Sequence, residues 1–222
     1  MDYKIIEVKE DIIRRNDSTA DSLRKMLKEK KIFFINLMAS PGSGKTTLLL
    51  HLLPLLKKKY RIAVMEADID SEVDAKTISE KLDIPTLQIH TSGACHLTAQ
   101  MVEDALSGFD ISNIDVLILE NIGNLVCPAE FDTGSNMNLV LLSVPEGDDK
   151  PLKYPLMFEV AHIVVITKVD TAPVFDFSIE EAKQNIKYRN DKVDIFVTSA
   201  TKDIGVSDLA SYIKKEVEEF IK

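Results

Sequence analysis

The chain has few of the features that mark secreted, disulfide-bonded or membrane-spanning proteins. It contains 222 residues but only two cysteines, which are too few for a disulfide framework. No apolar run approaches the ~20 residues that span a bilayer, and the charged N-terminus argues against a signal peptide. We therefore expect a cytoplasmic protein that does not enter membranes, and the two cysteines need another explanation.

Basic residues are outnumbered, and no segment is rich in proline or glycine. The 27 basic and 36 acidic residues give a net charge of -9, which disfavours binding to nucleic acid and to anionic membranes. With 45% apolar residues, the chain can bury a sizeable core. Because no flexible linker divides it, we expect residues 1–30 to form a helical extension packed on one domain of residues 31–222.

The N-terminal extension has apolar residues at helical spacing on both sides of a polar break. These residues are Ile5, Val8, Ile12, Leu23 and Leu27. The polar residues Asn16, Asp17 and Ser18 favour a turn, so we expect one helix to end and another to begin there.

Short apolar segments alternate with helical patterns along the rest of the chain. Continuous apolar strands are typical of parallel sheets that are covered on both faces. The predicted strands are residues 31–38, 60–68, 86–90, 115–120, 139–144, 161–167 and 195–198. The predicted helices begin at residue 47, cover 74–82, open at Cys95 and His96, and cover 206–221. This alternation predicts an α/β fold with a mostly parallel sheet and helices on both faces.

Residues 39–46, Ala-Ser-Pro-Gly-Ser-Gly-Lys-Thr, lie between a predicted strand and a predicted helix. Gly42 and Gly44 would let backbone N–H groups surround a phosphate, Lys45 would reach the terminal phosphates, and Thr46 would ligate Mg²⁺. The pattern G-x-x-x-x-G-K-[ST] has glycine where this chain has Ala39, so a positive φ there would be strained. The alternative is a simple Gly-Ser turn. We predict a P-loop NTPase whose phosphate-binding residues also include Ser43 and Thr47.

Ligands of an open parallel sheet bind beyond the carboxyl ends of its strands. Asp68 and Glu120 end two predicted strands, so they would supply oxygen ligands for Mg²⁺ beside Thr46. The alternative is that these acidic residues only cap helices.

Residues 167–170, Thr-Lys-Val-Asp, fit the base-recognition pattern [NT]-K-x-D of GTPases. Asp170 would accept hydrogen bonds from guanine N1–H and the 2-amino group, while the stem of Lys168 packs along the purine. Ser199 and Ala200 follow the last strand and would lie at the edge of the base. Because adenine would leave the carboxylate unpaired, we predict GTP and GDP as ligands.

Cys95, His96 and Cys127 follow two strands on the nucleotide side of the predicted sheet. Thiolates and an imidazole suit Zn²⁺ or Ni²⁺. Taken singly, each residue is equally compatible with a small buried hydrophobe or a core histidine. Cys127 lies in residues 121–128, a candidate switch loop in which the N–H of Gly123 would meet the γ-phosphate. The spacing alone leaves both interpretations open.

Several longer segments resemble the HypB family of hydrogenase nickel-incorporation GTPases, in the SIMIBI class of P-loop NTPases. The segments are residues 37–49, Gly-Ala-Cys-His-Leu at 93–97, Glu-Asn-Ile-Gly-Asn-Leu-Val-Cys-Pro-Ala at 120–129, Glu-Gly-Asp-Asp at 146–149, and Thr-Lys-Val-Asp at 167–170. The resemblance implies that Cys95, His96 and Cys127 form a regulatory metal site for Ni²⁺ or Zn²⁺. It also implies that Asp74 assists GTP hydrolysis and that Lys153 reaches the nucleotide of a partner copy.

The resemblance further implies a GTP-dependent homodimer that works with other hydrogenase-maturation proteins and the apo-hydrogenase large subunit. Some family members carry a Cys-rich or His-rich nickel motif near the N-terminus, whereas residues 1–30 here contain no cysteine or histidine. We therefore expect a partner to supply the metal.

Two alternative functions are a urease-type nickel-insertion GTPase and a metal-binding scaffold without activity. The related urease nickel-insertion GTPases carry Cys-Pro-His, whereas Cys127 and Pro128 are followed here by Ala129. A metal-binding scaffold with a degenerate phosphate loop is disfavoured by the intact Lys45, Thr46 and Asp170.

Overall fold

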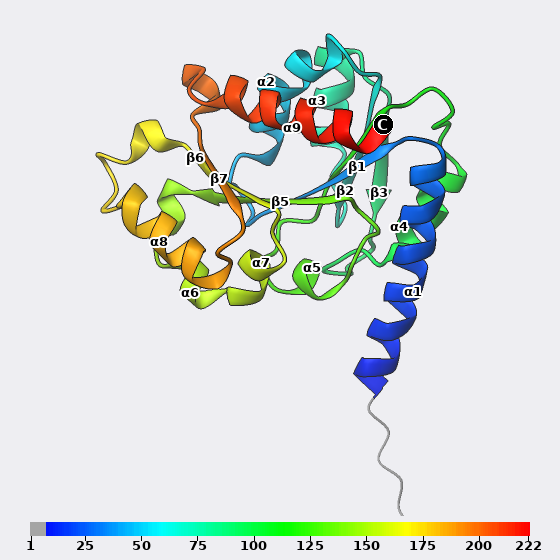
Figure 1. Cartoon of the computed structure of the whole chain (residues 1–222), viewed down its shortest axis with the longest axis horizontal. Helices are drawn as coiled ribbons and strands as arrows, with labels where there is room; N and C mark the ends of the chain where they lie inside the picture. The colour runs from blue at the N-terminus through cyan, green and yellow to red at the C-terminus, as the bar shows by residue number, and fades with distance from the viewer. Residues whose placement is uncertain (1–7) are drawn as a thin grey trace, which may run out of the picture.

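The computed structural model describes residues 8–222, in which a seven-stranded sheet lies between two layers of helices (Figure 1). The strands are β1 (Phe33–Met38), β2 (Ile62–Asp68), β3 (Thr86–His90), β4 (Val116–Glu120), β5 (Met137–Ser143), β6 (Ile163–Thr167) and β7 (Asp194–Val197). Their order is β3-β2-β4-β1-β5-β6-β7, and each described pairing is parallel. The predicted α/β class and parallel sheet are confirmed.

Helices cover both faces of this sheet. The longer ones are α1 (Val8–Glu29), α2 (Lys45–Lys57), α3 (Val73–Leu82), α4 (Ala99–Ser107), α8 (Ile179–Arg189) and α9 (Val206–Ile221). The short ones are α5 (Cys127–Glu130), α6 (Lys150–Lys153), α7 (Pro155–Glu159) and the 3-10 turns η1 (Val144–Glu146), η2 (Val169–Thr171) and η3 (Ala200–Lys202). Helices α2, α3 and α9 pack on one face, and α1, α4, α7 and α8 on the other (Figure 1).

The central strand shows why continuous apolar segments became parallel strands. All six residues of β1 are buried. Phe33, Ile35 and Leu37 join the core cluster under α2 and α9, whereas Phe34 joins the cluster under α1 and α4. A strand covered on both faces does not alternate apolar with polar residues, because one buried face would then consist of polar groups that need partners.

The predicted break at residues 16–18 is wrong, because α1 is one continuous helix. The Asn16 side chain accepts a hydrogen bond from Ala99 N (2.8 Å) and donates to the backbone oxygen of Asp132 (2.9 Å). Its amide is thus satisfied by tertiary contacts and does not compete for the helix backbone.

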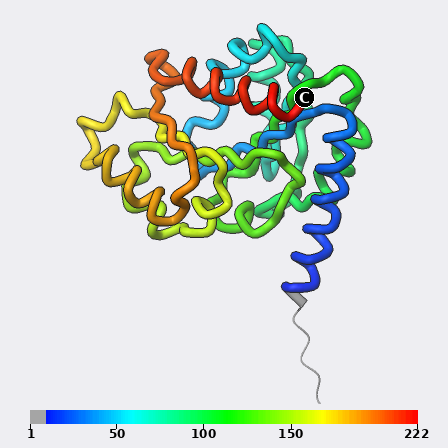
Figure 2. Tube along the Cα trace, viewed as in Figure 1, coloured from blue at the N-terminus to red at the C-terminus, as the bar shows by residue number. Residues whose placement is uncertain are grey.

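The two ends of α1 differ in their packing. Leu23 and Leu27 are buried in the core cluster beside β1, whereas Ile12 is 50% exposed and Ile5 lies outside the described residues. Figure 2 shows the start of α1 extending away from the rest of the described chain. The division of the chain near residue 30 stays a prediction. Among the described residues, no helix is both long and apolar enough to cross a membrane.

Three local predictions differ from the structure. Cys95 and His96 do not open a helix: α4 begins at Ala99, because Thr98 caps it by accepting a hydrogen bond from Met101 N (3.3 Å). The predicted loop 121–128 does not continue to Pro128, because α5 begins at Cys127 and Pro128 lies in its first turn, where its missing N–H is not needed. The predicted elements also leave out α6, α7 and α8.

Candidate functional site

The predicted phosphate loop joins β1 to α2. Gly42 (φ 72°) and Gly44 (φ 98°) both adopt the left-handed conformation that glycine tolerates. Gly44 caps α2 without a side chain, so the N–H groups of the first helical turn remain available to an anion. Ala39 is buried and does not have a positive φ, so alanine fits there without strain.

Carboxylates gather at the start of α2. Thr46 Oγ1 donates a hydrogen bond to Glu120 Oε1 (2.8 Å), which brings two of the three predicted magnesium ligands together. Glu120 is only 1% exposed, and its Oε2 is buried without a hydrogen-bond partner in the described chain. Burial raises the pKa of Glu120 to about 7, although the charge of Lys45 opposes this. A buried unpartnered carboxylate oxygen beside a hydroxyl fits a hard cation such as Mg²⁺.

Asp68, the third predicted magnesium ligand, ends β2 on the same side. Its Oδ1 accepts hydrogen bonds from the backbone N–H groups of Asp70 (3.0 Å) and Ser71 (2.8 Å), and these bonds lower the pKa of Asp68. Asp74 lies in the first turn of α3, where it is half-buried, and its charge acts on Glu120. The structure therefore brings Asp74 into the electrostatic neighbourhood of the phosphate loop.

Glu66 also belongs to this cluster of carboxylates. The sequence predicted it only as part of a strand and not as a site residue. It lies in register with Glu120 on the neighbouring strand, is 3% exposed, and has a buried Oε2 without a hydrogen-bond partner in the described chain. Burial raises its pKa to about 7. The available signal was a charged residue inside an apolar strand, two positions before Asp68.

The predicted base-recognition residues line one pocket of about 240 Å³. Its walls include Ser43, Gly44, Thr47, Lys168, Asp170, Ser199 and Ala200. Ser199 Oγ donates to Asp170 Oδ1 (2.5 Å) and Lys168 Nζ donates to the backbone oxygen of Gly42 (2.6 Å). Thr167 Oγ1 donates to the backbone oxygen of Ser43 (2.9 Å). The loop after β6 is thus tied directly to the phosphate loop.

Gly123 lies against the phosphate loop, whereas Lys153 does not line the base pocket. A Cβ atom at Gly123 would meet three atoms of Pro41 at 3.0 Å, so a side chain here would require the phosphate loop to shift by a few tenths of an ångström. Lys153, in α6, forms an ion pair with Asp149 (2.5 Å) and is absent from the residues that line the base pocket.

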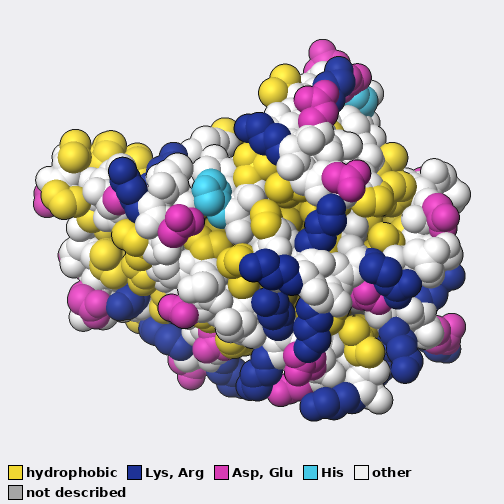
Figure 3. Space-filling model, turned by 90° about the horizontal axis from the view of Figure 1, so that it is seen from above, with side chains coloured by type: hydrophobic (Ala, Val, Ile, Leu, Met, Phe, Trp, Pro, Cys, Tyr) yellow, Lys and Arg dark blue, Asp and Glu magenta, His cyan; other side chains and the backbone are white. Residues whose placement is uncertain are grey.

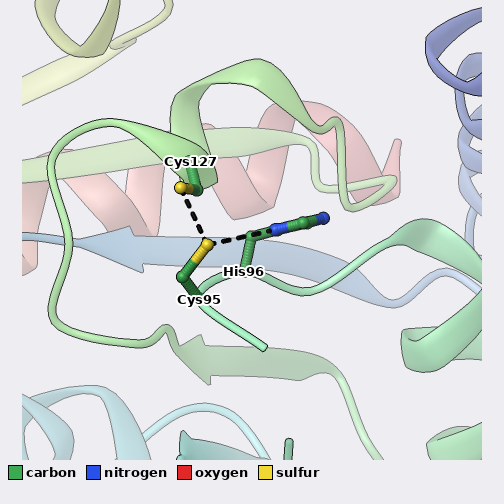
Figure 4. A group of neighbouring side chains, drawn as sticks. All are labelled: Cys95, His96 and Cys127. Atoms are coloured by element: carbon green, nitrogen blue, oxygen red, sulfur yellow. Dashed lines mark hydrogen bonds between the residues drawn. The ribbon is translucent and has the colours of Figure 1, made fainter. Parts of the chain in front are cut away.

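The three predicted soft ligands come together from two segments (Figure 4). Cys95 and His96 lie in the loop between β3 and α4, and Cys127 is the first residue of α5. The Sγ atoms of Cys95 and Cys127 are 2.8 Å apart, Cys95 Sγ is 3.7 Å from His96 Nδ1, and the candidate ligand atoms of all three lie within 4.8 Å of one another. This donor set fits a soft or borderline metal ion such as Zn²⁺ or Ni²⁺.

The surroundings hold this cluster in place. The His96 ring stacks on Phe131, with the ring centroids 3.9 Å apart, and burial lowers the pKa of His96, which favours the neutral ligand form. Asn124 Nδ2 donates to the backbone oxygen of Cys95 (3.3 Å), linking the two ligand-bearing loops. The hydrogen bond between the thiols raises the pKa of Cys95, so a metal would have to displace a proton.

Comparison with known proteins agrees with this geometry. Residues 33–197 match the family model described as the CobW/HypB/UreG nucleotide-binding domain. The chain is 40% identical over 220 residues to the hydrogenase/urease maturation factor HypB of Helicobacter hepaticus, covering 97% of this chain and 90% of that protein. The chain belongs to the HypB family. The family resemblance in the sequence is thereby confirmed.

Other relatives agree with the family assignment. The hydrogenase maturation factor HypB of Escherichia coli K12 is 38% identical over 213 residues, covering 96% of this chain and 73% of that protein. The HypB structure from Helicobacter pylori, in complex with nickel, superposes with a TM-score of 0.87 at 37% identity, covering 94% of this chain and 97% of that one. The HypB structure from Archaeoglobus fulgidus gives a TM-score of 0.85 at 31% identity, covering 92% and 99%.

Proposed function

We propose that this HypB-family chain is a GTPase whose nucleotide state controls a nickel- or zinc-binding site during hydrogenase maturation in the cytoplasm. One observation carries the proposal. Residues 120–127 begin with Glu120 beside Thr46, pass Gly123 against the phosphate loop, and end at Cys127 in the soft-ligand cluster. A change in this segment on loss of the γ-phosphate would therefore move a metal ligand directly.

The residues around the phosphate loop support GTP hydrolysis. Lys45 would bind the terminal phosphates, and Thr46, Asp68 and Glu120 would hold Mg²⁺. The ion would neutralise charge on the phosphates. Asp74 would orient the attacking water from the start of α3. The products are GDP and phosphate.

The base pocket supports guanine over adenine. Asp170 presents its carboxylate to the pocket and accepts from Ser199, while Lys168 bridges to the phosphate loop. Guanine offers two donors to a carboxylate, and adenine would leave its lone pairs unpaired in the pocket.

The soft-ligand cluster supports metal transfer by a dimer. One copy supplies three ligands, whereas a closed Zn²⁺ site takes four, so a second copy would complete the set. In a GTP-dependent homodimer, Lys153 would reach the partner's nucleotide.

Figure 3 shows hydrophobic side chains gathered at the left end, where Figure 1 places the loop between β6 and α8. In this loop Val174 is 82% exposed and Phe175 is exposed, which gives an apolar surface suited to contact with another chain.

We propose that nickel is passed to the apo-hydrogenase large subunit together with other maturation proteins. A second candidate target is urease, because the Helicobacter hepaticus relative is named a hydrogenase/urease maturation factor. Delivery assays with each purified apo-enzyme would distinguish the targets.

Turnover of GTP and ATP by the purified chain tests the enzymatic part of the proposal. We expect Mg²⁺-dependent release of phosphate from GTP and little from ATP, with the activity lost in Lys45→Ala. A parent protein that releases no phosphate from GTP, alone or with metal, would instead favour a metal-binding scaffold.

A further inference from the structure

Three oxygen-bearing side chains form a row across the sheet beside the phosphate loop. Glu66 of β2 is in register with Gln88 of β3 on one side and with Glu120 of β4 on the other. Side chains alternate between the faces of a strand, and those in register share a face. Val64 and Ile118, two positions before Glu66 and Glu120, belong to the core cluster under α2. The row therefore lies on the face where α2 begins.

Each member of the row has a buried oxygen without a hydrogen-bond partner in the described chain. These atoms are Gln88 Oε1, Glu66 Oε2 and Glu120 Oε2. Gln88 Nε2 donates to the backbone oxygen of Glu66 (3.3 Å), which places the amide against that residue. Buried polar atoms in native proteins nearly always have a partner, and water or an ion supplies it when no protein group does.

The charges around these buried oxygens indicate what kind of partner they bind. The carboxylates of Asp68, Asp74 and Glu120 act on Glu66, and the Lys45 ammonium acts on Glu120 and Asp68. Four carboxylates facing one ammonium favour a divalent cation. Mg²⁺ in proteins keeps several of its waters, and residues that hold such waters tune its binding.

We propose that Glu66, held by Gln88, is a positioning residue of the magnesium site that accepts hydrogen bonds from water bound to the ion. This inference rests on the proposed magnesium and nucleotide site, in which Thr46, Asp68 and Glu120 are the direct ligands. It explains why an acidic residue occupies the interior of an otherwise apolar strand. A glutamate with a purely structural role would instead be satisfied by protein groups.

The test is the affinity for fluorescently labelled GDP, measured in EDTA and over a series of Mg²⁺ concentrations. Glu66→Gln keeps the size and shape of the side chain but removes its charge and replaces one acceptor oxygen by a donor. We expect the Mg²⁺ concentration at half effect to rise about tenfold, while the affinity in EDTA stays unchanged. Glu72→Gln is the matched control, because it removes the same charge from an exposed position next to α3 and should leave the Mg²⁺ midpoint unchanged.

A second variant tests the role of Gln88. Gln88→Met removes the amide beside Glu66 and should raise the Mg²⁺ midpoint about threefold, a smaller effect because the carboxylate itself remains. In the Glu66→Gln background the same change should add nothing, because the Gln88 side chain acts on the site through the Glu66 carboxyl group, with which it interacts. Fully additive shifts would contradict this arrangement.

Two results would overturn the assignment of Glu66. One is a Glu66→Gln protein with the parent's Mg²⁺ midpoint, and the other is an equal loss of GDP affinity in EDTA and in Mg²⁺, which indicates a structural role. Failure of the underlying function looks different: a parent that binds GDP with the same affinity in EDTA and in Mg²⁺ has no magnesium site for Glu66 to serve.

Discussion

Replacing Glu66 with glutamine should stabilise the metal-free protein much more at neutral pH than at pH 5. Burial raises the pKa of Glu66 from an ordinary 4.5 to about 7. The unfolded chain therefore releases this proton near pH 4.5, whereas the folded chain keeps it until about pH 7. Between these values the folded state binds more protons, so the contribution of Glu66 to stability falls as the pH rises. Glutamine does not titrate, so the variant escapes this loss.

The two pKa values set the size of the effect. The difference between about 7 and 4.5, at about 1.4 kcal/mol for each pKa unit, gives up to ~3.5 kcal/mol. Taking the difference between variant and parent removes the contributions of groups that do not interact with Glu66. Burial lowers the pKa values of His96 and His162, so their contributions change with the opposite sign over the same pH range.

Urea unfolding in EDTA, without nucleotide, at several pH values between 5 and 8 measures this difference. The advantage of Glu66→Gln over the parent should grow from below ~1 kcal/mol at pH 5 to ~2–3 kcal/mol at pH 7.5. Glu72→Gln should show no such growth, because Glu72 is exposed. A pH-independent difference, or a variant less stable than the parent at pH 7.5, would refute the reasoning.

Four further substitutions test other parts of the site. Gly123→Ala places a Cβ 3.0 Å from three atoms of Pro41, so it should cost ~1–3 kcal/mol of unfolding free energy and weaken GDP binding; unchanged values for both would show that the loops separate freely. Asp170→Asn should shift preference from guanine towards xanthine nucleotides, and equal affinity of the parent for ATP and GTP in competition would contradict this. Lys45→Ala should abolish nucleotide binding, whereas Asp74→Ala should bind GTP but hydrolyse it slowly; hydrolysis at the parent rate would reduce Asp74 to a residue of the first turn of α3.

Local patterns predicted the strands because burial on both faces leaves a continuous apolar signal. They failed where a tertiary contact decided the local structure. Asn16 reads as a turn residue, yet α1 continues because Ala99 and Asp132 satisfy its amide. The sequence did not predict helix α8, although Ser178 caps it by accepting a hydrogen bond from Glu181 N (3.2 Å). The reason is that few of its residues are buried, so the helical spacing of apolar residues is weak.

The site was predictable to the extent that its residues belong to contiguous motifs. The phosphate loop and residues 167–170 carry their own spacing, so their meeting in one pocket followed from the parallel topology. Identifying Glu66 as a site residue required the strand register, because the register places it opposite Glu120. No local sequence pattern gives that register. The sulfur–sulfur distance of 2.8 Å between Cys95 and Cys127 likewise depends on how two loops fold over the sheet edge.

The affinity for Ni²⁺ or Zn²⁺ in the two nucleotide states tests the central claim most directly. Metal should be titrated into the protein saturated with GDP and into the protein saturated with a non-hydrolysable GTP analogue, with Cys127→Ala as the variant lacking a ligand. We expect the two affinities to differ by at least about fivefold, with sedimentation as a dimer in the analogue state and with the difference lost in Cys127→Ala. By linkage, the metal must change the affinity for the analogue relative to GDP by the same factor. Binding of metal by a monomer with one affinity in both nucleotide states would contradict the coupling and the shared site.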